Sequence, residues 1–103
     1  MFVINKTDEF EAWLEKLADR LGKAIILARL TAAEQGKLGD WKTIKGELCE
    51  MRLHFGPGYR LYFVKRKNVL IVMLAGGSKS TQVRDIRKAE RILGELEIDD
   101  GKD

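Results

Sequence analysis

The middle of the chain holds four side chains that could bind a phosphate and move a proton: Arg52, His54, Arg60 and Tyr62. Arg52 and His54 alternate with apolar residues in one predicted strand, and Arg60 and Tyr62 do so in the next. Because successive side chains of a strand point to opposite faces, we expect all four on one open face, opposite the core. Two guanidiniums without nearby carboxylates are complemented by a phosphate, and an imidazole titrates near neutral pH. The pattern therefore predicts an anion-binding face with His54 as its proton-transfer group.

Each of these residues also has an explanation that needs no ligand. A single histidine on the exposed side of a strand is more often solvated than catalytic, and Arg52 can simply pair with Glu50 or Glu47. Arg60 points away from the predicted core and is the hardest to explain in this way. Arg60 is therefore the firmest candidate, while both interpretations of the other residues stay open.

A second candidate anion site is the run Gly76–Thr81, which follows one predicted strand and precedes the last predicted helix. Its Gly-Gly-Ser-Lys order does not match the phosphate loop of nucleotide hydrolases, in which Gly, Lys and Ser or Thr are contiguous. The free amides of a helix N-terminus together with Lys79 still attract an oxyanion. A plain turn in which Ser78 or Ser80 caps the helix is the alternative.

Positive charge is concentrated between Trp41 and Arg91. This segment holds twelve Lys or Arg against four acids, whereas the remaining chain is net acidic. Such an asymmetry favours a polyanionic partner, and RNA is the one we expect. A solvated helix face balanced by Asp85 and Glu90, or a surface for a partner protein, would produce the same pattern. The last predicted helix carries four of these cations on one side, namely Arg84, Arg87, Lys88 and Arg91.

Composition limits the class of protein. The 103 residues, 45% of them hydrophobic, suffice for one core, and no linker-like segment divides them, so we expect a single domain over residues 1–103. No apolar run approaches the length of a membrane-spanning helix, and the apolar residues 2–4 are too few for a signal peptide. With one cysteine, Cys49, and one histidine, no disulfide or zinc set is expected. The expectation is a cytoplasmic protein with no membrane association, no metal and no cofactor, and with Cys49 in the core.

Two helices are expected in the N-terminal third. Thr7 caps the first helix, in which apolar residues recur at helical spacing as far as Leu21. Gly22 is expected to interrupt it, and a second helix runs from about Lys23 to Gly36, a suitable C-cap residue. The two form a helical hairpin whose apolar stripe must pack against a sheet.

The sheet is expected to come from short apolar or alternating runs separated by turns at Gly56–Gly58 and Lys65–Asn68. The last helix has an apolar side that includes Val83, and the acid-rich segment from Glu95 onward is expected to fray or fold back. The predicted fold class is α+β, a small antiparallel sheet with an N-terminal helical hairpin and a C-terminal helix, in the order β-α-α-β-β-β-α. The predicted strands are 2–5, 49–55, 59–64 and 69–75, the last one central because it is apolar on both faces, and 41–45 is a further candidate.

Two runs of this sequence resemble small toxins of the RelE/ParE superfamily, most closely the HigB-like branch called addiction module killer proteins. The runs are LHFGPGYRLYF at residues 53–63 and MLAGGSKSTQVRDI at residues 73–86. The expected element order also fits, so the resemblance covers nearly the whole chain. It implies a RelE-like toxin domain of a type II toxin–antitoxin pair, neutralised by a small antitoxin that in this branch usually carries a helix-turn-helix fold.

The resemblance also implies a reaction. RelE-like members are metal-independent endoribonucleases that cleave mRNA in the ribosomal A site, where the 2′-hydroxyl of the RNA attacks the adjacent phosphate. Arg60 matches the arginine of the family's Gly-Tyr-Arg block. The implied catalytic residues are Arg60 and Arg52, which stabilise the phosphorane, and His54 or Lys79, which move protons. The implied RNA-binding residues are Lys42, Lys45, Tyr62, Arg84, Arg87, Lys88 and Arg91.

The C-terminal region departs from the family pattern. Several RelE-like nucleases use a tyrosine there as general base, but Arg84 stands at roughly that position and no tyrosine follows Tyr62. Either another group takes the proton or the activity differs from that of RelE. Two other functions stay open: a ParE-like poison of DNA gyrase on the same fold, and a non-catalytic basic interaction module.

Overall fold

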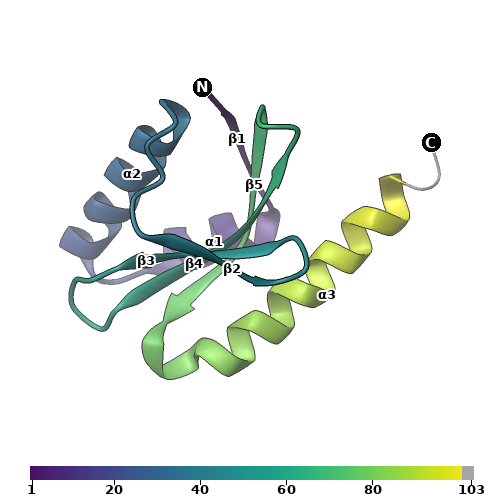
Figure 1. Cartoon of the computed structure of the whole chain (residues 1–103). Helices are drawn as coiled ribbons and strands as arrows, with labels where there is room; N and C mark the ends of the chain where they lie inside the picture. The colour runs from purple at the N-terminus through teal and green to yellow at the C-terminus, as the bar shows by residue number, and fades with distance from the viewer. Residues whose placement is uncertain (101–103) are drawn as a thin grey trace.

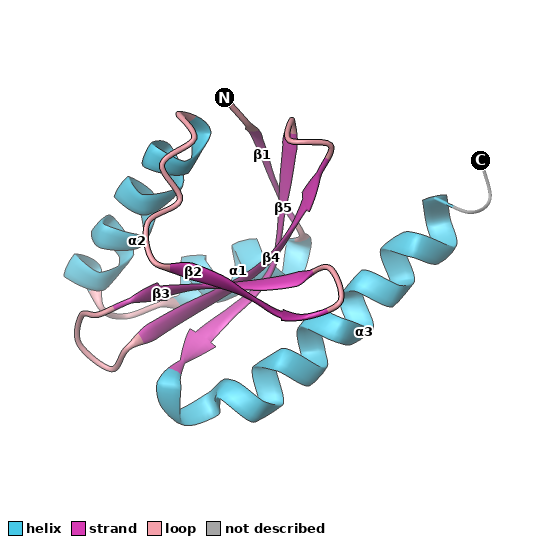
Figure 2. Ribbon diagram, viewed as in Figure 1, coloured by secondary structure: helices cyan, strands magenta, loops and turns pink. Residues whose placement is uncertain are grey.

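Five strands form one mixed sheet, and three helices pack around it (Figures 1 and 2). The structure is a computed structural model that describes residues 1–100. The predicted α+β class is confirmed. In chain order the elements are β1 Val3–Lys6, α1 Asp8–Lys16, α2 Arg20–Glu34, β2 Trp41–Lys45, β3 Leu48–Leu53, β4 Tyr59–Arg66, β5 Leu70–Ser78, a single 3-10 turn Lys79–Thr81, and α3 Gln82–Asp100.

The sheet order is β1-β5-β4-β3-β2, with β1 parallel to β5 and all other neighbours antiparallel. The sheet is mixed rather than antiparallel, which corrects one expectation. The candidate strand 41–45 is confirmed as β2, so the predicted element order lacked one strand. Short turns connect β2 to β5 in succession and impose antiparallel pairing. Two helices separate β1 from the rest of the sheet, which leaves it free to run parallel to β5. β5, predicted to be the central strand, is an interior strand between β1 and β4, and β4 is the central one.

The break between the first two helices lies at residues 17–19 rather than at Gly22. Thr7 caps α1 as predicted, by accepting a hydrogen bond from the backbone amide three residues later. Asp19 caps α2 in the same way through the Gly22 amide, over 2.9 Å, so Gly22 belongs to the first turn of α2. A Cβ at residue 22 would collide with Asp19 and with the ring of Tyr59. Gly22 therefore permits close packing and does not end a helix.

The apolar sides of α1 and α2 pack on one face of the sheet and form the larger core. The inward alternation predicted for β3 is confirmed, since Cys49, Met51 and Leu53 are all buried on this face. Burial raises the pKa of the Cys49 thiol, as expected for a core cysteine. The other elements contribute Phe10, Leu14, Ile26, Leu30, Tyr59, Leu61 and Phe63.

α3 covers the opposite face, which the sequence predicted to be open. Leu48, Val64 and Leu74 of the sheet pack there with Ala89 and Ile92 of α3. Because β5 is apolar on both faces, its second face also has to be shielded from water, and the apolar side of α3 does this. The predicted RNA-binding residue Tyr62 is on this face and is fully buried, so the expectation that it lies exposed is wrong.

The last helix is longer than predicted. The segment from Glu95 was expected to fray or fold back, but it is helical as far as Asp100, while 101–103 lie outside the described residues. Val83, predicted on the buried side of this helix, is exposed. Within residues 1–100, no helix is both long and apolar enough to cross a membrane.

Alanine at two glycines should have opposite effects on stability. The ring of Trp13 lies against Gly76 of β5, so a Cβ at residue 76 would collide with it. Gly94 in α3 has open space around its Cβ position, and alanine is the better helix former. We expect Gly76→Ala to destabilise the fold by about 1–3 kcal/mol and Gly94→Ala to stabilise it by about 0.5–1 kcal/mol. Urea unfolding of both variants measures this. Equal unfolding midpoints for the two variants would contradict the close packing of Trp13 on Gly76.

Candidate functional site

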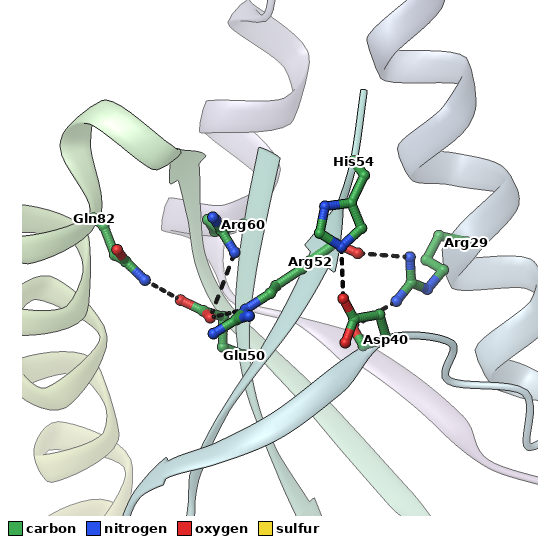
Figure 3. A network of polar contacts seen from close by, with 7 residues as sticks. All are labelled: Arg29, Asp40, Glu50, Arg52, His54, Arg60 and Gln82. Atoms are coloured by element: carbon green, nitrogen blue, oxygen red, sulfur yellow. Dashed lines mark hydrogen bonds and ion pairs between the residues drawn. The ribbon is translucent and has the colours of Figure 1, made fainter. Parts of the chain in front are cut away.

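A fully buried carboxylate, that of Glu50 in β3, lies at the centre of the polar face that the sequence predicted (Figure 3). Arg52 donates from Nε to Glu50 Oε1 over 2.9 Å, and Gln82 of α3 donates from Nε2 to Glu50 Oε2 over 2.7 Å. Arg60 Nη1 lies 3.8 Å from Glu50 Oε1. The strand register makes this possible, because Arg52 of β3 lies directly opposite Arg60 of β4. The Glu50 cluster, formed by these four residues, thus joins two strands and the start of α3.

Arg60 is the main correction to the predicted site. It was expected on an open surface without nearby carboxylates, but its side chain is only 11% exposed and forms an ion pair with Glu50. Arg52, which is 30% exposed, also pairs with Glu50, which is one of the alternatives that its sequence position allowed. Within the described part of the chain, the buried Nε and Nη1 atoms of Arg60 have no hydrogen-bond partner. Arg60 therefore retains unused donors, although α3 and the sheet leave little of it accessible.

Glu50 is ionised despite its burial. Burial by itself raises the pKa of this carboxyl, but hydrogen bonds from Arg52 and Gln82 and the charge of Arg60 outweigh it. The pKa of Glu50 consequently lies below its ordinary value. At neutral pH the Glu50 cluster combines two positive guanidiniums with one negative carboxylate and keeps a net positive charge.

Tyr62 is a buried neighbour of the Glu50 cluster on β4. It lies opposite Glu50 in the β3–β4 register, and burial together with the charges of Glu50 and Asp85 raises its pKa. Tyr62 is therefore protonated at neutral pH. Asp85 of α3 is itself buried and accepts a hydrogen bond from the hydroxyl of Thr81. Tyr62 itself packs in the smaller core with Leu74 of β5 and Ala89 of α3, so it has a structural place between the sheet and α3 and offers no surface for RNA.

His54 lies outside the buried cluster, just after the end of β3. Its Nε2 is 2.6 Å from Asp40 Oδ2, and the imidazole is 73% exposed (Figure 3). The bond from His54 is the largest of the effects that lower the pKa of Asp40. Arg29 of α2 fixes the surrounding backbone by donating to three carbonyls, those of Leu38, Asp40 and Arg52. An acid that holds one ring nitrogen orients the imidazole for proton exchange at the other.

A basic hollow of about 480 Å³ lies at the start of α3, next to the Glu50 cluster. We refer to it as the α3 hollow. Three of the predicted residues, Lys79, Arg84 and Arg87, line it together with Gln82. Because the Gln82 amide also reaches the Glu50 carboxylate, this side chain connects the hollow to the buried cluster. The arrangement suits a phosphate chain that runs along α3 toward the cluster.

The remaining predicted RNA-binding residues lie on the edge strand β2 and on α3. Lys42 of β2 is exposed and lies opposite Glu50 in the register, so it borders the Glu50 cluster. Lys45 and Arg91 each form a surface ion pair with an acid of α3. Lys88 lines a separate hollow beside α1. Arg84, Arg87, Lys88 and Arg91 are all exposed and recur at helical spacing, so they share one side of α3, opposite the buried Ala89 and Ile92, as predicted.

Sequence reasoning missed Glu50 and Gln82 as members of the site and Asp40 as the partner of His54. A signal for Glu50 was present, because it alternates with apolar residues in step with Arg52 and so shares a face with it. Gln82 had no such signal, since its role depends on α3 covering that face. Among residues 1–100, no group of three or more His, Cys, Asp or Glu side chains is placed to hold a metal ion.

The chain is similar to bacterial proteins from two species. A protein of Haemophilus influenzae (strain Rd) that carries the description "uncharacterized protein" is 40% identical over 93 residues, which cover 90% of this chain and 94% of that protein. The solution structure of the conserved hypothetical protein HP0894 from Helicobacter pylori matches with a TM-score of 0.51 and 20% identity, over 78% of this chain and 97% of that one. The second likeness shows the fold alone. No family model matches the chain.

The charge of Glu50 predicts how stability responds to acid. Because the folded-state pKa of Glu50 is depressed, its contribution is present above the ordinary pKa of 4.5 and is lost as pH falls through the lower folded-state value. Glu50→Gln should therefore flatten the acid side of the stability profile. At neutral pH it should cost on the order of 3 kcal/mol, since two guanidiniums lose their counter-charge. Thermal unfolding between about pH 7 and about pH 3 measures both effects.

Glu95→Gln is the matched control for this measurement. Glu95 is also ion-paired with an arginine, but both partners are exposed, so the substitution should change the profile little. An acid profile of Glu50→Gln that coincides with that of the unchanged protein would show that Glu50 is not ionised in the folded state.

Proposed function

The chain belongs to the same family as the Haemophilus influenzae protein, and we propose that it is a RelE-like toxin of a type II toxin–antitoxin pair that cleaves mRNA on the ribosome without a metal. Membership of the RelE/ParE superfamily is part of this proposal and is supported by the sequence runs 53–63 and 73–86. Both runs contribute to one region of the fold. The first carries His54 and Arg60, and the second carries Gln82 and the other residues of the α3 hollow except Arg87.

The observation that carries the proposal is that one carboxylate, that of Glu50, forms ion pairs with both Arg52 and Arg60. Two guanidiniums normally repel each other, but a carboxylate between them keeps both in place before any ligand arrives. Prepositioned donors suit a reaction in which negative charge grows on a phosphate, because they need little reorganisation as the charge develops. Arg52, whose side chain is 30% exposed, can contact that charge directly, whereas the Nε and Nη1 atoms of Arg60 are buried and Arg60 acts on it through its positive charge.

In the proposed reaction the 2′-hydroxyl of a ribose attacks the adjacent phosphorus. Its proton passes to a base, the bond between phosphorus and O5′ breaks, and O5′ takes up a proton. The products are a 2′,3′-cyclic phosphate and a 5′-hydroxyl end. Arg52 and Arg60 stabilise the pentavalent phosphorane, and His54, oriented by Asp40, accepts the proton of the 2′-hydroxyl. Lys79 or the protonated imidazole returns a proton to O5′.

Glu50 has the role of a positioning residue in this scheme. Both of its oxygens already accept hydrogen bonds, and its pKa is lowered, so it is a poor proton acceptor. His54 is exposed and can be reached by a ribose hydroxyl. This assignment also accounts for the missing C-terminal tyrosine of RelE-like nucleases, because the base comes from the end of β3 instead of from α3.

The proposal includes partners and a location. A toxin of this class works in the cytoplasm on ribosomes and mRNA, and a small antitoxin, here proposed to be of helix-turn-helix type, neutralises it. The exposed Lys42 and the α3 hollow flank the Glu50 cluster, and both suit the phosphates on either side of a scissile bond. No metal or other cofactor is assigned to the reaction.

The burial of Arg60 favours a second candidate function. A guanidinium that is 11% exposed and paired with a carboxylate suits a structural role, and a ParE-like gyrase poison or a basic interaction module needs no accessible phosphate site. Both alternatives act by binding a partner, and in both the basic surface would be the part that binds. They differ from the nuclease in what happens to RNA in the cell.

Inducing the chain in a bacterium and mapping the 5′ ends of mRNA separates these functions. We expect new ends in phase with codons and intact chromosomal DNA, because the ribosome presents the message to the site one codon at a time. Intact messages together with double-strand DNA breaks would identify a gyrase poison. Intact messages and intact DNA would leave only the interaction module.

Substitutions at the exposed His54 and the partly exposed Arg52 then locate the chemistry. Because Arg52 also hydrogen-bonds Glu50, thermal unfolding of its variant is measured as well. Arg52→Gln and His54→Asn should each lower cleavage by about 100-fold, since one removes a charge-stabilising donor and the other the proton acceptor. Arg60→Ala should also abolish cleavage, but it leaves Glu50 undercompensated, so its thermal unfolding has to be measured alongside. Arg20→Gln removes an exposed charge from α2 and should cleave like the unchanged protein. Full cleavage by a folded Arg52→Gln or His54→Asn protein would refute the site.

A further inference from the structure

The edge strand β2 carries an exposed indole on the face opposite the Glu50 cluster. Trp41 is 36% exposed and lies opposite Met51 in the β2–β3 register, which places it on the α1 and α2 side of the sheet. Its ring packs at a tilt against Phe63, with the ring centres 5.9 Å apart. Trp41 is thus held by the core on one side and open to solvent on the other, and nothing in the proposed cleavage reaction uses it.

A cation lies over this indole. Lys65 of β4 has its Nζ 4.9 Å from the centre of the Trp41 ring and 5.8 Å from that of Phe2. A lysine in this position is held by the ring quadrupole and has no carboxylate partner among the described residues. An arriving anion can therefore draw the ammonium away from the ring without breaking an ion pair, which uncovers the indole.

A hollow of about 420 Å³ opens in front of Trp41 and Lys65. This Trp41 hollow is within the size range of small-ligand sites. Lys67 and Asn68, the two residues with positive φ in the β4–β5 turn, reach its rim, and Glu47 at the rim is neutralised by an ion pair with Arg66. The hollow therefore combines an aromatic ring, two lysines and an amide.

We infer that the Trp41 hollow binds one unpaired nucleotide of single-stranded RNA, with the base stacked on the indole and the phosphate on Lys65 and Lys67. Stacking on an aromatic side chain beside backbone-binding cations is how proteins hold single strands without reading their sequence. A base in a duplex is already stacked and does not fit such a site. An acidic peptide would satisfy the lysines but would leave the ring without a partner.

The position of the Trp41 hollow connects it to the Glu50 cluster. Trp41 and Lys42 are consecutive residues of a strand and point to opposite faces, and Lys42 lies opposite Glu50. An RNA strand that crosses the free edge of β2 passes from the cluster to the hollow. This part of the inference rests on the proposed nuclease function, whereas RNA binding at Trp41 does not require it.

Fluorine NMR of the chain labelled with 5-fluorotryptophan tests the inference without altering the fold. The chain has two tryptophans, Trp13 and Trp41, and Trp41→Phe identifies which signal belongs to which. The probe is a short 2′-O-methyl RNA single strand, which cannot be cleaved because it lacks the attacking hydroxyl. We expect it to shift the Trp41 signal in a saturable manner, while the same sequence as a duplex and a polyglutamate peptide leave the signal in place.

Variants of the rim provide the control. Lys65→Met and Lys67→Met should each weaken binding and reduce the slope of log affinity against log salt by about 0.7, the value for one phosphate contact with a single strand. Lys16→Met removes an exposed lysine of α1 that lines a different hollow, so it should weaken binding less than either rim variant. A Trp41 signal that does not move with the single strand, or that moves equally with duplex or peptide, overturns the inference.

The experiments distinguish a failure of the nuclease proposal from a failure of the proposed RNA binding at the Trp41 hollow. If mRNA is cleaved in the cell but the Trp41 signal is unmoved, the nuclease stands and the Trp41 hollow is not an RNA site. If the signal moves but messages stay intact, the chain binds single-stranded RNA there without being a nuclease.

Discussion

The burial of one ionised carboxylate is the constraint on which the rest of this structure depends. A charge removed from water is tolerated only where it is paired and hydrogen-bonded, so Glu50 requires donors from several directions. Arg52 donates to it from the sheet and Gln82 from α3, and Arg60 adds a nearby positive charge. These contacts hold two guanidiniums side by side and fix the first turn of α3. The position of the α3 hollow follows from the same bonds.

α3 links the stability of the fold to the candidate site. Its apolar side closes the second face of the sheet, and its first turns bring Gln82 and the cations of the α3 hollow to the Glu50 cluster. The helix lies close to β5 because Gly77 has no side chain, since a Cβ there would collide with Asp85. The face that looked like an open anion site is therefore a protein interior with a polar end, and Arg60 and Tyr62 belong to that interior.

Two zones with different chemistry meet at the edge strand β2. On one face Lys42 borders the Glu50 cluster, and on the other face Trp41 lies under Lys65. Because neighbouring residues of a strand point in opposite directions, a strand of five residues can serve both zones. The proposed cleavage site and the proposed base-stacking site are in this way parts of one path for a single RNA strand.

The sequence by itself determined the α+β class, most of the helices and strands, and the face of β3 that enters the larger core, because strand alternation and helical spacing are local and specify which side of an element is apolar. It also singled out Arg52, His54 and Arg60 as the polar residues of one region. Only the tertiary structure decided that Arg60 is buried against Glu50, that His54 pairs with Asp40, and that Gln82 completes the cluster. These contacts depend on where α3 and the loop before β2 come to lie, and contacts between residues distant in the chain leave no periodic pattern from which one sequence can reveal them.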